Sequence, residues 1–204
     1  MQTFIFDVDG TLIDSGAKDR ETMRQALAEY GYSFTTGELL FCFGMPAHSS
    51  MTALGVRPEQ MEAITRRWEE LAYRELDKIP VYDGIVDMLT ALRAAGKPRG
   101  IVTSRTRAQF ERGFVPIGLN GYFDTAVCAD EVEHPKPAPD ALLACIRRLG
   151  GTPEESIYIG DSAYDMQCAR AAGVRSALAL WGCHEPDKLE ADMRLAHPSE
   201  ILEL

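Results

Sequence analysis

Short apolar segments that each end in polar residues recur along this 204-residue chain, and they constrain its fold more than any other feature. Each segment is short, apolar and β-prone, so each is predicted to be a buried strand. Helical patterns lie between them, and this alternation predicts a parallel sheet covered by helices on both faces. We therefore expect an α/β fold whose core is a doubly wound, Rossmann-like parallel sheet. The predicted strands are 3–6, 100–102, 125–128, 156–159 and 174–180, and the predicted core helices are 84–95, 106–117, 138–149 and 162–172, with a short terminal helix starting at Pro198.

The stretch from residue 15 to residue 80 breaks this alternation. It contains three helical patterns and no comparable apolar strand, with glycines and prolines between the helices. We predict a helical insertion, here called the cap domain (15–80), in a core domain formed by residues 1–14 and 81–204. Ser15 and residues 79–82 are expected to act as hinges, since they join the two parts. The predicted cap helices are 19–30, 46–54 and 58–77.

Polar residues that suit phosphate and metal chemistry follow the ends of the predicted strands. In an open α/β sheet, ligands bind beyond the carboxyl ends of the strands, so these residues are expected to converge on one crevice. Carboxylates are ligands for hard cations, whereas a hydroxyl and an ammonium suit phosphate oxygens. The converging residues are Asp7, Asp9, Thr103, Ser104, Lys136, Asp161 and Asp165.

Asp7 and Asp9 belong to the string Asp-Val-Asp-Gly-Thr that directly follows the first predicted strand. Residues two apart in an extended chain point to the same side, so both carboxylates can face one substrate. One carboxylate can attack phosphorus while the other transfers protons. We assign the attack to Asp7 and the proton transfer to Asp9. A bare Asp-x-Asp is also typical of an acidic turn, but the fuller string after an apolar strand is much rarer by chance.

The other residues of this set each have a simpler structural interpretation. Asp161 and Asp165 lie one helical turn apart at a strand-to-helix junction, where they can address a cation or merely favour the helix N-terminus. Lys136 lies among three prolines that can hold its ammonium in place, although most lysines face solvent. Thr103 can bind a phosphate oxygen or cap the next helix. The order of these residues among the acidic motifs favours the functional interpretation.

Four motifs of the chain, taken together, resemble those of the haloacid dehalogenase superfamily, in order and over the whole chain. They are the string 7–11, the pair Thr103-Ser104, the pair Lys136-Pro137, and Gly160-Asp161 with Asp165. The resemblance implies a phosphoric monoester hydrolase that uses Mg²⁺ and forms an aspartyl-phosphate intermediate.

The same resemblance implies a role for each residue of the motifs. Asp7 would be the nucleophile, and Asp9 would be the acid and base as well as a metal ligand through its backbone carbonyl. Asp161 would bind the metal with the support of Asp165. The phosphate-binding residues would be Thr103, Ser104 and Lys136, and the metal site would comprise Asp7, Asp9, Asp161 and Asp165.

The predicted cap is similar to the C1 cap of the subgroup that contains phosphoglycolate phosphatases, β-phosphoglucomutases and PpaX-type pyrophosphatases. Residues 130–137 look most like the phosphoglycolate phosphatase and PpaX branch, so we expect a small phosphorylated substrate. Three alternatives stay open: an inorganic pyrophosphatase, a β-phosphoglucomutase-like phosphotransferase, and a non-catalytic protein that binds a phosphorylated ligand. The mutase is disfavoured because Asp19 and Ala47 stand where mutases carry a His and an Arg. Lys18 and His48 are candidate substrate contacts of the cap.

Composition narrows the possible partners and location of this chain. The chain has 21 Lys and Arg against 31 Asp and Glu, which gives a net charge of −10. This charge argues against nucleic acid as a partner, because binding to its phosphate backbone depends on clustered Lys and Arg. No run approaches the ~18–20 apolar residues of a membrane span, and no basic leader opens the chain, so we expect a cytoplasmic monomer or homodimer without membrane contact.

Several residues are expected to have structural roles alone. Five cysteines without CxxC spacing predict free, mostly buried thiols. Trp68 and Leu71 are predicted in the core of the cap, and Trp181 near the last strand, whereas His184 and His197 are predicted at the surface.

Overall fold

A six-stranded sheet forms the centre of the computed structural model, which describes residues 2–42, 44–74 and 79–204. The strand order is β3-β2-β1-β4-β5-β6, and every neighbouring pair is parallel. The order runs in opposite directions on the two sides of β1, as in a doubly wound sheet, so the predicted fold class is confirmed. The strands are β1 (Thr3–Phe6), β2 (Arg99–Val102), β3 (Thr125–Val127), β4 (Ser156–Gly160), β5 (Arg175–Ala179) and β6 (Met193–Leu195).

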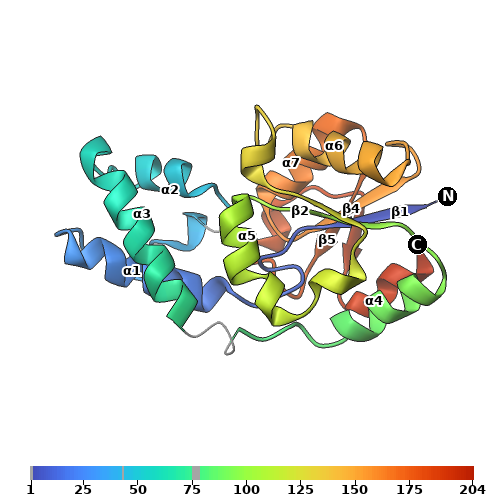
Figure 1. The fold of residues 1–204 in the computed structure, drawn as a ribbon, viewed down its shortest axis with the longest axis horizontal. Coiled ribbons are helices and arrows are strands. Elements are labelled where there is room, and N and C mark those ends of the chain that lie inside the picture. The colour runs from blue at the N-terminus through green and yellow to red at the C-terminus, as the bar shows by residue number, and fades with distance from the viewer. Residues whose placement is uncertain (1, 43, 75–78) are drawn as a thin grey trace.

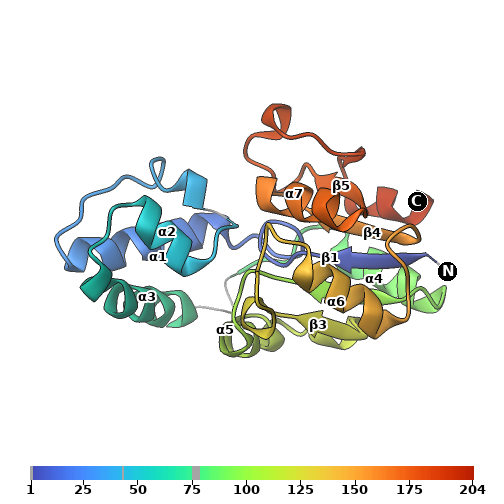
Figure 2. The same ribbon diagram turned by 90° about the horizontal axis from the view of Figure 1, so that it is seen from above.

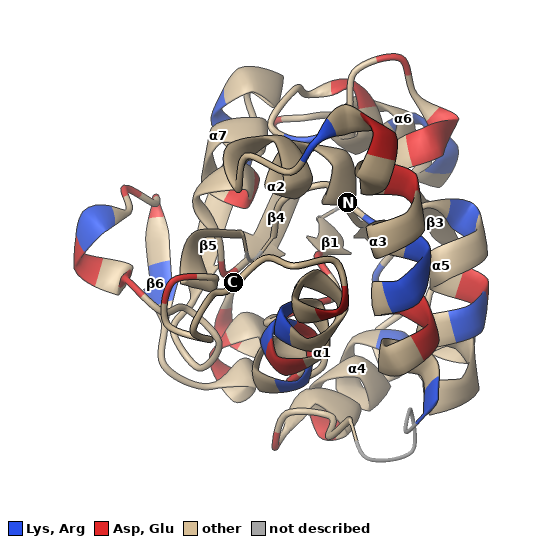
Figure 3. Cartoon of the chain, turned by 90° about the vertical axis from the view of Figure 1, so that its left-hand side faces the viewer, with Lys and Arg blue, Asp and Glu red and all other residues tan. Residues whose placement is uncertain are grey.

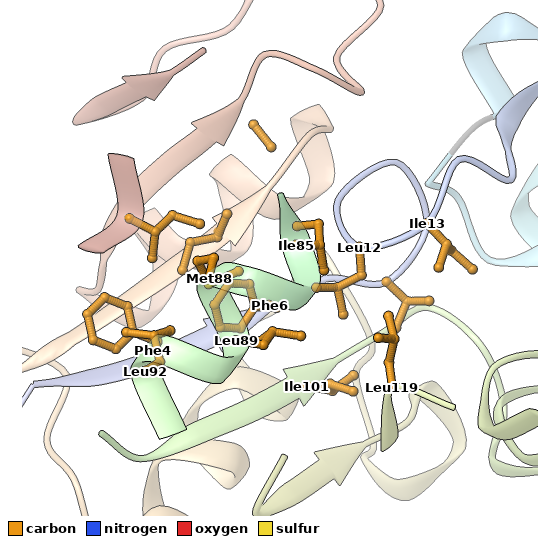
Figure 4. Close-up of a cluster of buried hydrophobic side chains, with 14 of the residues drawn as sticks. Phe4, Phe6, Leu12, Ile13, Ile85, Met88, Leu89, Leu92, Ile101 and Leu119 are labelled. Atoms are coloured by element: carbon orange, nitrogen blue, oxygen red, sulfur yellow. The ribbon is translucent and has the colours of Figure 1, made fainter. Parts of the chain in front are cut away.

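Helices cover both faces of this sheet, with α6 and α7 on one side and α4 on the other (Figure 1). The side chains of β1 alternate between the two layers: Phe4 and Phe6 pack with α4 and α5, whereas Ile5 packs with α6 and α7. Figure 4 shows the first of these clusters, in which Leu89 and Leu92 of α4 lie beside Phe4 and Phe6. The helices are α4 (Ile85–Ala94), α5 (Arg107–Gly113), α6 (Asp140–Leu149) and α7 (Ala163–Ala172).

Three further helices form a separate group beyond the end of the sheet toward which β1 runs (Figures 1 and 2). They have their own hydrophobic cluster, with Leu27 and Ile64 fully buried and with Trp68 and Leu71 packed against it, as the sequence predicted. Figure 3 shows Lys and Arg interspersed with Asp and Glu on α1 and α3. The helices are α1 (Gly16–Glu29), α2 (Ala47–Ala53) and α3 (Pro58–Ala72), with a 3₁₀ turn at Leu40–Cys42.

Two adjacent segments connect this helical group to the sheet. The amide of Asp14 donates to the carbonyl of Pro80 at 2.9 Å, and the amide of Tyr82 donates to the carbonyl of Leu12 at 3.2 Å. The predicted hinges therefore lie side by side, while the domain boundaries themselves stay a prediction. The helix predicted over 58–77 ends at Ala72, and its last residues, 75–77, lie outside the described residues.

The helix predicted over 106–117 is wrong in its second half. The helix α5 ends at Gly113, and a 3₁₀ turn follows at Val115–Ile117. Pro116 explains the break, because it has no backbone N–H and its ring clashes with a preceding turn of α-helix.

The sequence pattern did not predict the edge strand β6. It has only three residues and carries the exposed Arg194 at its centre, so no apolar run marks it. The predicted terminal helix is a 3₁₀ helix, Pro198–Glu203. Further short 3₁₀ turns lie at Asn120–Tyr122, Ala129–Glu131 and Pro186–Lys188.

The sequence also led to predictions about the cysteines and about membrane-spanning helices. All five cysteines are free thiols, and four of them are buried, as expected. Within the described ranges, each helix is too short or too polar to cross a lipid bilayer.

We expect Leu89→Ala to lower the free energy of unfolding by about 2–5 kcal/mol, because Leu89 is fully buried against β1 and its removal leaves a cavity. Leu202→Ala is the matched control, since that side chain is 47% exposed. Urea unfolding followed by circular dichroism measures both. Equal losses in the two variants would contradict the assignment of this core.

Candidate active site

The carboxyl ends of the central strands bring the motif residues to one edge of the sheet. Phe6 pairs with Ile101 on one side and Ile159 on the other, so the residues that follow all three strands lie at the same level. The amide of Asp7 donates to the carbonyl of Ile159 at 2.9 Å and extends this pairing by one residue. Asp7 therefore emerges between the ends of β2 and β4.

The loop after Asp7 turns tightly against the end of β4. Gly10 has a φ of +77°, and a Cβ there would clash with the carboxylate of Asp161, so both conformation and space require glycine. Thr11 donates from its hydroxyl to Oδ1 of Asp161 at 3.1 Å. The indole of Trp181 donates to the carbonyl of Thr11 at 2.9 Å, so this residue supports the loop in addition to packing near the last strand.

Lys136 lies between two carboxylates at the centre of the site. Its ammonium is 2.9 Å from Oδ1 of Asp7 and 2.8 Å from Oδ1 of Asp165, and its side chain is 1% exposed. It also donates to the hydroxyl of Tyr158 at 3.2 Å, and that hydroxyl lies 2.9 Å from Oδ1 of Asp165. The structure thus places Lys136 in the interior, in contact with the first and last motifs.

Asp165 is held at the start of α7 by the N-cap residue of that helix. Its Oδ2 accepts from the amide of Ser162 at 3.1 Å and from the Ser162 hydroxyl at 2.6 Å. Ser162 in turn caps the helix, so the two residues form a reciprocal capping box. The side chain of Asp165 therefore both takes part in the helix cap and contacts the ammonium of Lys136.

Three buried carboxylates cluster here, and the ammonium of Lys136 contacts two of them, Asp7 and Asp165. One oxygen of each of Asp7, Asp161 and Asp165 lies within 4.8 Å of the others. Burial, partly opposed by Lys136, raises the pKa of Asp7 to about 7. Burial and then the charges of Asp165 and Asp7 raise the pKa of Asp161 well above its ordinary value. An oxygen-rich, net negative cluster of this kind fits a hard divalent cation such as Mg²⁺.

Asp9 has different partners from Asp7. Its Oδ1 accepts from the hydroxyl of Ser15 at 2.6 Å and from Nη2 of Arg105 at 2.6 Å, and its Oδ2 accepts from Nε of Arg105 at 2.8 Å. Burial opposes ionisation of this carboxyl, but the Arg105 guanidinium outweighs burial and lowers the pKa of Asp9 below its ordinary value.

Thr103 and Ser104 lie at the end of β2 as predicted. Thr103 is buried, and its Oγ1 accepts from the amide of Arg105 at 3.2 Å. The capping role that was the alternative for Thr103 belongs instead to Thr106, which forms a capping box with Gln109. Ser104 donates from its hydroxyl to the carbonyl of Gly44 at 3.0 Å and so connects the sheet with the helical group.

A cavity of about 120 Å³ lies between the sheet edge and the helical group. Of the predicted site residues, Asp7, Asp9 and Ser104 line it. Lys18 and His48 are not among the lining residues, because the face of α1 toward the cavity carries Asp19 and Arg20 instead, and His48 is exposed. The remaining lining residues are Met23, Leu39, Cys42, Gly44, Met45, Ala47, Trp68, Glu69, Ala72, Tyr73, Arg105 and Gln109.

Two residues of the site, Arg105 and Tyr158, were not predicted from the sequence. Arg105 directly follows Thr103-Ser104, and that adjacency to a motif was the available signal. Tyr158 lies at the centre of a predicted apolar strand, where its hydroxyl gave no indication of a contact with Lys136. His184 and His197 are exposed, as predicted, although His184 lies 3.0 Å from the guanidinium of Arg20.

Comparison with known proteins agrees with this geometry. A family model described as haloacid dehalogenase-like hydrolase matches residues 4–179. The chain is 29% identical to the pyrophosphatase PpaX of Bacillus velezensis over 98% of this chain and 94% of that protein. It is 31% identical to the probable phosphatase IndB of Dickeya dadantii over 98% of this chain and 88% of that protein. A crystal structure of a candidate phosphoglycolate phosphatase from Lactobacillus plantarum superposes with a TM-score of 0.91 at 32% identity, covering 99% of this chain and 98% of the other.

We expect the metal-free protein to become more stable as the pH falls from about 8 to about 5. The pKa values of Asp7 and Asp19 are raised to about 7 from an ordinary value of 3.8, chiefly by burial, so the folded state binds protons in this range that the unfolded state does not. A gain of about 1 kcal/mol raises the unfolding temperature of a chain of this size by ~2–4 °C.

Thermal unfolding in excess chelator at several pH values measures this effect. Mg²⁺ should reduce the pH dependence, because a bound cation replaces the protons, and Asp7→Asn should remove part of it. An unfolding temperature that is unchanged or falls between pH 8 and pH 5 would contradict the raised pKa values.

Proposed function

Because the chain belongs to the haloacid dehalogenase-like hydrolase family, we propose that it is a Mg²⁺-dependent phosphatase that hydrolyses a small phosphate ester through an aspartyl-phosphate on Asp7. One observation carries the proposal. Asp7 lines the cavity at the end of β1, and its carboxylate is held by the buried ammonium of Lys136. A carboxylate that lines a cavity and is held in place by an ammonium is suited to attack a bound phosphoryl group.

In the first step, an oxygen of Asp7 attacks phosphorus and the bond from phosphorus to the leaving oxygen breaks. The leaving oxygen takes a proton from Asp9. In the second step Asp9 takes a proton from water, the resulting hydroxide attacks the phosphorus of the aspartyl-phosphate, and inorganic phosphate is released with Asp7 restored. Asp9 is suited to both transfers because its carboxylate lines the same cavity as Asp7.

The phosphoryl oxygens need positive partners while this happens. Lys136 supplies a buried ammonium beside Asp7, and Thr103 and Ser104 supply hydroxyls at the end of the neighbouring strand. Asp165 and Tyr158 hold the ammonium in place, which favours a fixed rather than a mobile phosphate site. Oriented donors of this kind stabilise charge that develops in the transition state.

The carboxylates of Asp7 and Asp161 would hold Mg²⁺ directly, with the backbone carbonyl of Asp9, while Asp165 would support the site through its contacts with Lys136 and Ser162. When bound, the ion would neutralise charge on the phosphoryl group and orient it toward Asp7.

The size and lining of the cavity favour a small substrate. Its volume of about 120 Å³ is well below the ~300–1,000 Å³ typical of sites for drug-sized ligands. Hydrolysis of a phosphoglycolate-like ester is therefore the first candidate. Hydrolysis of pyrophosphate is the second, and the similarity to a PpaX pyrophosphatase favours it.

Phosphate transfer between sugar hydroxyls is less well supported. Asp19 and Ala47, which stand where mutases carry a His and an Arg, both line the cavity and provide no cation there.

We further propose that residues 15–80 act as a cap that closes over the site about Ser15 and residues 79–82. We also propose that the protein is cytoplasmic.

We predict that Asp7→Asn lowers kcat for phosphate release at least about 1,000-fold, because an amide is a poor nucleophile of nearly the same shape. Release of phosphate from p-nitrophenyl phosphate measures this, and circular dichroism verifies the fold. Asp187→Asn is the matched control, since that side chain is fully exposed. Activity of folded Asp7→Asn within tenfold of the parent protein would overturn the assignment of the nucleophile.

Excess chelator should abolish turnover and Mg²⁺ should restore it. Mg²⁺ should also raise the unfolding temperature of the parent protein, because the cation binds the folded state alone. Asp161→Asn should lose most of this rise, whereas Asp187→Asn should keep it. Full activity in chelator, or an unfolding temperature that does not respond to Mg²⁺, would exclude the proposed metal site.

A further inference from the structure

A planar, two-point contact joins Arg105 to the proposed acid. Nε and Nη2 of Arg105 donate to the two different oxygens of Asp9, at 2.8 Å and 2.6 Å, and the Ser15 hydroxyl donates to one of them as well. The two side chains are only 15% and 17% exposed. Such a two-point contact between a guanidinium and a carboxylate is among the stronger ion pairs in proteins.

This contact conflicts with the proposed role of Asp9. A carboxylate that accepts hydrogen bonds at both oxygens has no proton to donate to a leaving group. Asp9 must therefore leave the guanidinium, at least in part, before it can act as an acid. A group that competes for the same guanidinium would favour that change.

Arg105 is placed where a substrate can supply such a group. It lines the same cavity as Asp7 and Asp9, and among the described residues the only other cation in the lining is Arg20. The Arg20 guanidinium lies 3.0 Å from Nε2 of His184, whereas Arg105 is the one of the two that contacts Asp9. Arg105 is thus the cation nearest to the position where the leaving group must meet Asp9.

The surroundings hold the Arg105 side chain in this position. A Cβ on Gly113 of α5 would clash with Nη1 of Arg105, so the guanidinium occupies the space that this glycine leaves open. The ring of Tyr73 lies on the same side, close to that Cβ position. The backbone amide of Arg105 is also bound, since it donates to Thr103.

We propose that Arg105 determines specificity by binding a second anionic group of the substrate, a carboxylate or phosphate next to the leaving oxygen, in exchange for Asp9. The substrate class is then a phosphate ester or anhydride with an anionic leaving group. Neutral alkyl phosphates are poor substrates because they leave the pair of Arg105 and Asp9 intact. This inference rests on the proposed function of the same site.

Kinetics on a matched pair of esters test the proposal. 2-Phosphoglycolate and ethyl phosphate differ by a carboxylate, and pyrophosphate supplies a phosphate instead. We expect kcat/KM of the parent protein for 2-phosphoglycolate or for pyrophosphate to exceed that for ethyl phosphate about 100-fold or more. Arg105→Gln should abolish most of this preference: kcat/KM for the two anionic substrates should fall, whereas kcat/KM for ethyl phosphate should not fall, because Asp9 no longer has to leave a guanidinium before it can act as an acid. Arg105→Lys should restore part of it, since a lysine keeps the charge without the two-point contact.

Two further variants control for structural effects. Gly113→Ala displaces the guanidinium without changing the charge of Arg105, so it should lower the same preference, and it serves as the test if Arg105→Gln does not fold. Arg107→Gln removes a guanidinium two residues away that pairs with Glu131 outside the cavity, so it should keep the preference. Equal losses for charged and neutral esters in Arg105→Gln would overturn the proposal and indicate a structural role.

Binding separates this inference from the proposed function. Calorimetry of 2-phosphoglycolate with Asp7→Asn and with Asp7→Asn/Arg105→Gln, both with Mg²⁺, needs no turnover. Tight binding that is lost with Arg105 supports the anion site even if the parent protein releases no phosphate, a result that would reject the proposed function alone. Equal affinity in the two variants would reject the role of Arg105, whatever the turnover.

Discussion

The buried ammonium of Lys136 is the interaction on which the rest of the site depends. It contacts Asp7 at the end of β1 and Asp165 at the start of α7, and both carboxylates are almost inaccessible to water. Unpaired buried carboxylates are strongly unfavourable, so these strand and helix ends can meet only with a cation between them. Asp161, the third carboxylate, accepts a hydrogen bond from Thr11 but forms no ion pair with a cation among the described residues. The remaining negative charge is what makes the cluster suitable for a divalent cation.

A second set of contacts couples this chemistry to the cap. Asp9 is bound by Ser15, the residue that precedes α1, and by Arg105, which follows the end of β2. The proposed acid is therefore held by one residue at the hinge and one at the sheet edge. Ser104 binds the carbonyl of Gly44, and Gln109 of α5 donates to Glu69 of α3 at 2.6 Å, so the helical group touches the same edge at further points. A change in the position of the cap would alter the surroundings of Asp9 directly.

The fold and most of the candidate site could be predicted because they rest on local signals. Apolar runs such as 3–6 end in chemically distinctive residues, and parallel strands bring their carboxyl ends to one edge. The errors arose where the local signal was weak or ambiguous. Residues 106–117 have a helical pattern, but Pro116 interrupts it, and β6 is held by its partner β5 rather than by an apolar run. The candidate cap contacts Lys18 and His48 do not line the cavity, whereas their neighbours Asp19, Arg20 and Ala47 do, because only the packing of α1 and α2 decides which side of each helix faces it.

The sequence by itself determined the doubly wound sheet and the identity of the residues at its carboxyl edge, because strand pattern and motif order are properties of short segments. Only the tertiary structure decided which of those residues touch. Lys136 is separated from Asp7 by more than a hundred residues, and its burial beside Asp7, Asp165 and Tyr158 follows from the packing of α6 and α7 on the sheet. The pairing of Arg105 with Asp9 was likewise decided by packing, since a guanidinium after a strand can face solvent, a helix end or a carboxylate, and the space above Gly113 directs it to the last of these.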